Sequence, residues 1–119
     1  MKVLVIDDEK LVRWFLERAL RKWNHNVTSA SDGNKAIDLL KSNSYDIVFT
    51  DLKMPAADGS SVIEYLNGMA NTPSIIVCSA YITPEMEDDF RNRGLLALKK
   101  PFKLEELEDI MKKITTLNI

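Results

Sequence analysis

The sequence predicts an α/β fold, a three-layer α/β/α sandwich built on a parallel five-stranded sheet. Short apolar segments, most of them rich in β-branched residues, alternate along the chain with longer segments whose apolar residues recur at helical spacing. The short segments are nearly all apolar, which is typical of strands buried on both faces. Strands separated by helices must run parallel, with right-handed crossovers. The 119 residues, 45% of them apolar, fit one compact domain over residues 1–119.

Five segments are predicted to be strands and five to be helices. The strands are KVLVI at 2–6, NVTSA at 26–30, DIVFT at 46–50, SIIVC at 74–78 and LLALK at 95–99. Four helices are predicted from their apolar faces, which hold Leu11, Phe15, Leu16, Ala19, Leu20 and Trp23, then Ala36, Ile37 and Leu40, then Val62, Ile63 and Leu66, and last Leu104, Leu107, Ile110, Met111 and Ile114. The helix before the last strand is predicted from its ends, with Thr83 as N-cap, Pro84 at the first position and Gly94 just past the end.

The composition excludes several classes of protein. The 16 basic and 18 acidic residues are spread along the chain and leave a net charge of -2, so no basic block indicates binding to nucleic acid or to a membrane surface. The single cysteine, Cys78, cannot form an internal disulfide, which suits a reducing cytosol. The apolar N-terminal segment is too short for a signal peptide or a membrane span. We therefore expect a cytoplasmic protein.

Polar side chains follow the predicted strands at their carboxyl ends, where open parallel sheets bind their ligands. In chain order these residues are Asp7-Asp8, Asp51, Ser79-Ala80 and Lys100-Pro101. Each alone has an ordinary explanation, such as a helix cap, a turn residue or a surface lysine. These separate explanations do not account for why all of the residues follow strands. The carboxyl ends of parallel strands meet at one edge of the sheet, so these side chains are expected to lie close together. Three acids, a hydroxyl and an ammonium group are therefore predicted to form one site.

Three carboxylates this close together repel one another by about 4 kcal/mol per pair at 4 Å and an effective dielectric constant near 20, so they need a cation or raised pKa values. Magnesium suits such a site, since it prefers oxygen ligands and often takes one or two carboxylates together with a phosphoryl oxygen. Lys100 and the Ser79 hydroxyl would then face the remaining phosphoryl oxygens. Asp51 would be the nucleophile, because carboxylates can form aspartyl-phosphate intermediates.

The chain resembles the receiver domains of two-component response regulators over essentially its whole length. The matching segments are VLVIDDE, YDIVFTDLKMPAADG, SIIVCSA and KKPF, in the order that the family has them. The resemblance implies a flavodoxin-like fold with strand order 2-1-3-4-5, and a phosphoryl group transferred from a histidine kinase to Asp51. It also implies that Asp8, Asp51 and the backbone carbonyl of Lys53 bind magnesium, while Asp7 supports the ion through water.

The same resemblance assigns the remaining residues of the site. Ser79 takes the position of the switch hydroxyl, Lys100 is the lysine that contacts the phosphate, and the Lys100-Pro101 bond is expected to be cis. One position departs from the family: Ala97 stands where receivers usually carry a Tyr or Phe that turns inward on activation. Whether Tyr81 substitutes for that aromatic residue or is a surface tyrosine is left open.

The function implied is a regulatory switch rather than an enzyme. The domain would assist its own phosphorylation and dephosphorylation, and phosphorylation would change the surface formed by the last two helices and the strand between them. The expected partners are a sensor histidine kinase or phosphotransfer protein and an output domain or target protein. Dimerisation on phosphorylation is a further expectation, and the oligomeric state stays open.

Three other functions can be distinguished from this one by particular residues. A magnesium-dependent aspartyl phosphatase places an acid two residues after its nucleophile, where this chain has Lys53. A flavodoxin-like cofactor binder needs a phosphate loop rich in Gly, Ser and Thr after the first strand, and DDEK at 7–10 would repel the phosphate. A receiver fold kept as a docking module, without a conventional phosphorylation switch, is compatible with Ala97 and is the second hypothesis.

Overall fold

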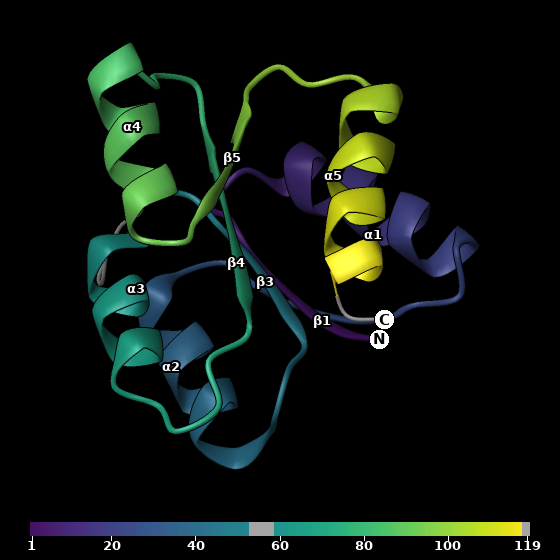
Figure 1. Cartoon of the computed structure of the whole chain (residues 1–119). Coiled ribbons are helices and arrows are strands. Elements are labelled where there is room, and N and C mark those ends of the chain that lie inside the picture. Colours follow the sequence, from purple (N-terminus) through teal and green to yellow (C-terminus); the bar gives the residue numbers. More distant parts are fainter. Residues whose placement is uncertain (53–58, 118–119) are drawn as a thin grey trace.

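Five parallel strands form one sheet in the order β2-β1-β3-β4-β5 in the computed structural model, which describes residues 1–52 and 59–117 (Figure 1). The strands are β1 (Lys2–Ile6), β2 (Asn26–Ala30), β3 (Ile47–Thr50), β4 (Ser74–Ser79) and β5 (Leu96–Lys99). The helices are α1 (Lys10–Lys22), α2 (Gly33–Ser42), α3 (Gly59–Asn67), α4 (Pro84–Asn92) and α5 (Leu104–Leu117). The predicted α/β sandwich and its strand order are confirmed, and each strand boundary lies within one residue of its prediction.

The helices cover the sheet in two layers, with α1 and α5 on one face and α2, α3 and α4 on the other (Figure 1). Successive residues of a strand point to opposite faces, so each strand contributes to both layers. In β1, Val3 and Val5 pack in the cluster under α1 and α5, whereas Leu4 and Ile6 pack in the cluster under α2 and α3. The central strands are therefore buried on both faces, as their apolar sequences indicate.

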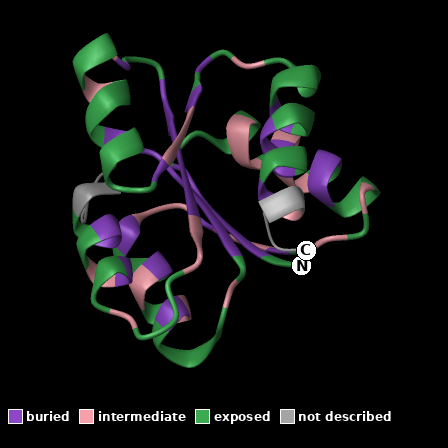
Figure 2. Ribbon diagram, in the orientation of Figure 1, coloured by how far each residue is buried: buried purple, intermediate pink, exposed green. Residues whose placement is uncertain are grey.

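The two edge strands are less buried than predicted. Thr28 and Ser29 in β2, and Leu96 and Ala97 in β5, are half-buried, whereas all four residues of β3 are buried (Figure 2). An edge strand has a neighbour on one side only, and the helix layers cover the middle of the sheet best. The expectation that every strand is buried on both faces is therefore wrong for β2 and β5.

Two leucines assigned to apolar helix faces point to solvent instead. Leu11 near the start of α1 is 78% exposed, and Leu104 at the start of α5 is 46% exposed. Both stand in the first turn of a helix, where the helix has only begun to cross the sheet. Among residues 1–52 and 59–117, no helix combines the length and the apolar content that crossing a membrane requires.

The end signals of α4 are confirmed. The Thr83 hydroxyl oxygen accepts a hydrogen bond from the Met86 N–H at 3.1 Å, and Pro84 is the first helical residue. After the helix, Gly94 has φ of 74°, a left-handed conformation that glycine adopts without steric strain. These local signals place the turns on both sides of α4, and so fix where β5 begins.

Candidate functional site

The polar residues predicted to form a site all stand at the carboxyl edge of the sheet, and the backbone extends the sheet pattern to hold them there. The Asp7 N–H donates to the Ala30 carbonyl at 3.2 Å, and the Asp51 N–H donates to the Ile6 carbonyl at 3.2 Å. The Lys100 N–H donates to the Ser79 carbonyl at 2.9 Å. Each residue therefore leaves its strand while still tied to the neighbouring strand, which limits the directions its side chain can take.

The Lys100 ammonium group holds this site together. Its Nζ atom lies 2.7 Å from Asp51 Oδ2, 2.8 Å from Asp7 Oδ2 and 3.0 Å from Glu9 Oε1. Lys100, Asp51 and Asp7 are 9%, 7% and 1% exposed, so these charges are buried and depend on one another for stabilisation. The Lys100-Pro101 peptide bond is cis, as the sequence resemblance implied.

The pKa directions follow from this arrangement. Burial acts to lower the pKa of Lys100, but its contacts with the carboxylates of Asp51, Asp7 and Glu9 outweigh burial, so its pKa is raised and the group stays an ammonium ion. Burial raises the pKa of Asp7 above its usual value of 3.8, against the opposing effects of Lys100 and of the Glu9 N–H, which donates to Asp7 Oδ1 at 2.9 Å. A positive charge placed near Asp7 would therefore offset the cost of keeping its buried carboxylate ionised.

The donor atoms of this cluster fit a hard divalent cation. Asp7, Asp8, Glu9 and Asp51 each offer a carboxylate oxygen, and these oxygens lie within 4.8 Å of one another. Among the described residues, the four carboxylates outnumber the ammonium group of Lys100 that faces them. Asp7 Oδ2 is buried and accepts no hydrogen bond of good geometry from any residue described, although the Lys100 ammonium lies 2.8 Å away. Oxygen ligands with excess negative charge are the set that magnesium prefers.

Two residues of the site were missed by the sequence analysis. Glu9 was not assigned a role, although it is the third consecutive acid after β1 and its carboxylate contacts Lys100. Arg13 was not considered either, and its Nη1 atom donates to the Asp7 backbone carbonyl at 2.7 Å. The run of three acids was a usable signal for Glu9, whereas the sequence offered none for Arg13 because its contact depends on the angle between α1 and the end of β1.

Ser79 lies at the same edge of the sheet, but its hydroxyl forms hydrogen bonds with the backbone of Tyr81. Its side chain is buried, and its Oγ atom accepts from the Tyr81 N–H at 3.3 Å and donates to the Tyr81 carbonyl at 3.4 Å. In the part of the chain that is described, no hydrogen bond joins this hydroxyl to the acids or to Lys100. The Tyr81 side chain is 67% exposed, so its surface orientation is the one observed.

The remaining residues singled out from the sequence are Asp8, Ala97 and Lys53, and they lie in different places. Asp8 is exposed at the rim of the cluster, within reach of the other acids. Ala97 is half-buried in β5 opposite Val77 of β4, so the departure from the family pattern lies beside the strand that ends in Ser79. Lys53, whose carbonyl was assigned to the metal, lies outside the described residues.

Comparison with known proteins agrees with this architecture. A family model described as "Response regulator receiver domain" matches residues 3–112. The chain is 27% identical to sporulation initiation phosphotransferase F of Bacillus subtilis, covering 98% of this chain and 94% of that protein. It is 37% identical to response regulator MprA of Mycolicibacterium vanbaalenii, covering 90% of this chain but only 47% of that longer protein.

A solved structure gives the same result at the level of the fold. The Francisella response regulator 1452 receiver domain superposes with a TM-score of 0.88 at 29% identity, over 99% of this chain and 98% of that one. The family match covers most of the chain, and the acids, the serine and the lysine stand at the carboxyl ends of the strands. The chain therefore belongs to the response regulator receiver domain family, whose typical role is a phosphorylation switch in two-component signalling.

Proposed function

We propose that Asp51 accepts a phosphoryl group from a histidine kinase or phosphotransfer protein, assisted by magnesium. The observation that carries this proposal is the buried contact of 2.7 Å between Lys100 Nζ and Asp51 Oδ2 within a cluster of excess carboxylates. An ammonium group there can neutralise negative charge on both the nucleophile and an incoming phosphoryl group. Family membership supports the same assignment.

In the proposed step, an oxygen of Asp51 forms a bond to phosphorus while the bond from phosphorus to the donor histidine nitrogen breaks. Phosphoryl transfer of this kind needs positioning and charge neutralisation more than covalent assistance. The backbone bond from Asp51 to Ile6 and the contact with Lys100 hold the carboxylate at the sheet edge. The carboxylate contacts of Lys100 are all made by one ammonium group. That group can exchange some of them for contacts with phosphoryl oxygens.

Magnesium, when bound, supplies positive charge that neutralises the phosphoryl oxygens. The proposed direct ligands are Asp8 and Asp51, with Asp7 acting through water. Lys53 completes the proposed set through its backbone carbonyl, although it lies outside the described residues. Glu9 is added as a rim residue whose side chain is 59% exposed and whose carboxylate is already shared with Lys100.

Ser79 is proposed as the switch hydroxyl. A phosphorylated Asp51 would carry about -1.5 to -2 charges and three additional acceptor oxygens. For Ser79 to donate to one of them, it must give up its bond to the Tyr81 carbonyl, and residues 80–83 lead directly into α4. The proposed response is therefore a movement of this segment, read out on the surface of α4, β5 and α5 by an output domain or target protein. With Ala97 in β5, this readout would proceed without the usual aromatic residue.

The proposal extends to the domain and its surroundings. We infer that residues 1–119 act as a single receiver domain that is regulatory rather than an enzyme in its own right, supported by the family match over residues 3–112. The cytoplasmic location, the identity of the partners and dimerisation on phosphorylation remain predictions. The second hypothesis, a docking module without a phosphorylation switch, differs from the first in one measurable property, which is whether Asp51 becomes phosphorylated.

The test is incubation with magnesium and acetyl phosphate, followed by intact mass spectrometry. We expect an adduct of one phosphoryl group on the native chain and none on Asp51→Asn. Asp109→Asn is the matched control, because Asp109 is an exposed aspartate of α5, away from the site. Absence of the adduct from the native chain would favour the docking module, and an adduct on Asp51→Asn would move the phosphoacceptor elsewhere.

A further inference from the structure

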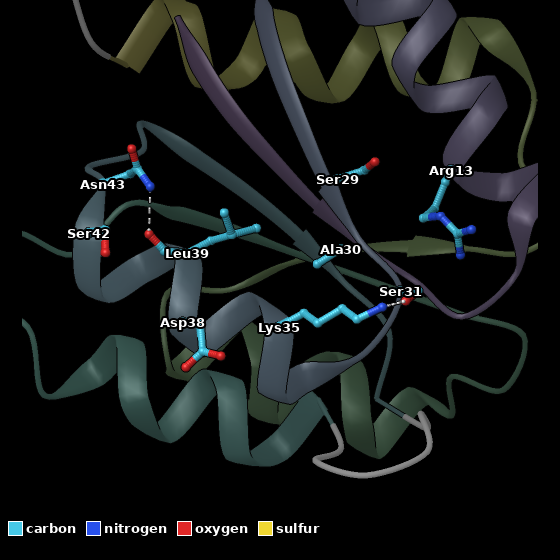
Figure 3. A pocket seen from close by; sticks show the side chains of 9 residues that line it. All are labelled: Arg13, Ser29, Ala30, Ser31, Lys35, Asp38, Leu39, Ser42 and Asn43. Atoms are coloured by element: carbon cyan, nitrogen blue, oxygen red, sulfur yellow. Dashed lines mark hydrogen bonds between the residues drawn. The ribbon is translucent and has the colours of Figure 1, made fainter.

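A polar cavity lies at the free edge of the sheet, next to the acidic cluster, because Arg13 both lines the cavity and donates to the Asp7 backbone carbonyl. Its volume is about 560 Å³, and it opens between α1, the carboxyl half of β2 and α2 (Figure 3). Because β2 is the edge strand, no further strand covers this side. The volume lies within the range of about 300 to 1,000 Å³ that small-ligand pockets occupy. Asp51, Ser79 and Lys100 do not line it.

Two cations line this cavity without a carboxylate partner. The half-buried Arg13 donates through Nη1 to the Asp7 backbone carbonyl at 2.7 Å, and Lys35 Nζ donates to the Ser31 hydroxyl at 3.2 Å. Both acceptors are neutral, and within residues 1–52 and 59–117 neither cation forms an ion pair. The lining holds one acid, Asp38, against these two cations. Since a half-buried cation gains from a counter-ion, the charge of this cavity favours an anion.

The edge of β2 adds neutral donors at the same place. The Asn26 N–H donates to the Met1 carbonyl and the Asp7 N–H donates to the Ala30 carbonyl, so these β2 residues face β1. In a parallel ladder the backbone groups of alternate residues point to opposite sides, so those of Val27 and Ser29 face the free edge, and the Val27 carbonyl does accept from Arg21 there at 3.2 Å. The backbone N–H of Ser29 therefore points to the free edge, where Ser29 also lines the cavity.

The two ends of the cavity differ. Figure 3 shows Arg13, Lys35 and Ser31 near one end and Ser42 and Asn43 at the other. The guanidinium of Arg13 comes from α1, the ammonium of Lys35 from α2 and the hydroxyl of Ser31 from the segment before α2, and donors of these kinds suit the oxygens of a phosphoryl group. The far end offers hydroxyl and amide groups that suit the hydroxyls of an organic group.

We propose that this cavity binds a small phosphate monoester that carries hydroxyl groups, such as a sugar phosphate. Arg13, Lys35 and Ser31 hold the phosphate non-covalently, and Asp38 and Asn43 accept hydrogen bonds from the hydroxyls. The site is separate from the phosphoacceptor and does not depend on the proposed phosphorylation. Arg13 links the two regions, because its guanidinium contacts the backbone of Asp7.

The test is a titration with glucose 6-phosphate or ribose 5-phosphate, followed by amide chemical shifts in NMR spectra. It is done on Asp51→Asn without magnesium, so that the acidic cluster has neither its phosphoacceptor nor a metal. We expect saturable shifts at Ser29, Ser31 and Lys35, and none with glucose at the same concentration. Shifts that do not saturate up to about 10 mM of either ester would mean a dissociation constant too weak for a specific site and would overturn the proposal. Shifts confined to residues near Asp8 would also overturn it.

A pair of charge substitutions on α2 tests the assignment of residues. Lys35→Gln is expected to weaken binding at least about tenfold, as expected for the loss of one hydrogen bond to a charged group. Lys41→Gln removes the same charge from the same helix but does not line the cavity, and we expect less than about a twofold change from this exposed charge. Equal effects of the two substitutions would show general charge attraction and would overturn the proposed contact with Lys35.

Discussion

Two lysines at the carboxyl edge of the sheet are held in opposite ways. Lys100 is buried and contacts three carboxylates, whereas Lys35 is exposed and contacts only the Ser31 hydroxyl. The regions around them also differ in sign, since acids outnumber Lys100 while cations outnumber the acid near Lys35. Asp7 joins them, with its carboxylate facing Lys100 and its backbone carbonyl accepting from Arg13. We therefore expect burial, rather than residue type, to decide whether a charge contributes to the stability of this fold.

The largest expected effect comes from removing the buried ammonium group. Lys100→Met should lower the free energy of unfolding by about 3 kcal/mol at pH 7, because it leaves buried carboxylates without their partner. The raised pKa of Lys100 means that its stabilisation is fully present below its usual value of 10.5 and is lost only as the pH rises through the higher, folded-state pKa. A urea titration at pH 7 therefore measures the whole effect. The exposed neighbour Lys99, changed to Met, is the control and should shift the value by less than about 0.5 kcal/mol.

Removing the charge of Asp7 is expected to raise the free energy of unfolding, the opposite of the effect expected at Lys100. Its pKa is raised on folding, so the folded state binds its proton more tightly, and its charge disfavours folding above the folded-state pKa. Asp7→Asn should therefore raise the free energy of unfolding at pH 7 by about 1 kcal/mol, measured without magnesium. The gain should shrink as the pH falls through the raised folded-state pKa of Asp7 and disappear below the usual value of 3.8, where the carboxyl is protonated in both the folded and the unfolded state. A gain that stays constant down to pH 3 would show that charge is not its cause.

Magnesium should bind the region around Lys100, where acids are in excess, and not the region around Lys35, where cations are in excess. Binding to the native fold alone stabilises it by RT ln(1 + c/Kd), where c is the free magnesium concentration, which is about 1 kcal/mol when the ion is at about five times its dissociation constant. We expect a rise in Tm with magnesium that is reduced in Asp8→Asn and unchanged in Asp38→Asn, the acid beside Lys35. Equal losses in both variants would indicate general screening of charge instead of a site.

The smallest effect is expected at Lys35. Lys35→Gln should change the free energy of unfolding by less than about 0.5 kcal/mol, since the side chain is exposed and its one partner is a neutral hydroxyl. The same urea titration used for Lys100 checks this. A loss above 1 kcal/mol would mean that Lys35 contributes to stability in the way that Lys100 does, and the contrast between the two regions would fail.

Most of the fold could be predicted because its signals are local. The apolar segments of β1 and β3 and the end signals of α4 at Thr83, Pro84 and Gly94 depend on residues that are neighbours in the chain. The errors arose where neighbours in space decide. Leu11 has the right spacing for the buried face of α1, but it stands where the helix has not yet reached the sheet. The edge strand β2 is half-exposed because no strand lies beyond it.

The order of residues along the chain was enough to predict the alternation of strands and helices, and with it the edge of the sheet at which Asp7, Asp51, Ser79 and Lys100 stand. That follows because parallel strands bring their carboxyl ends together whatever the details of packing. Which of these groups are in contact could not be predicted in this way and depends on the packed fold. Lys100 reaches Asp51, Asp7 and Glu9, while Ser79 bonds to Tyr81 and Arg13 reaches the Asp7 backbone. These choices depend on side-chain directions and helix angles set by the packed core, which no short stretch of sequence encodes.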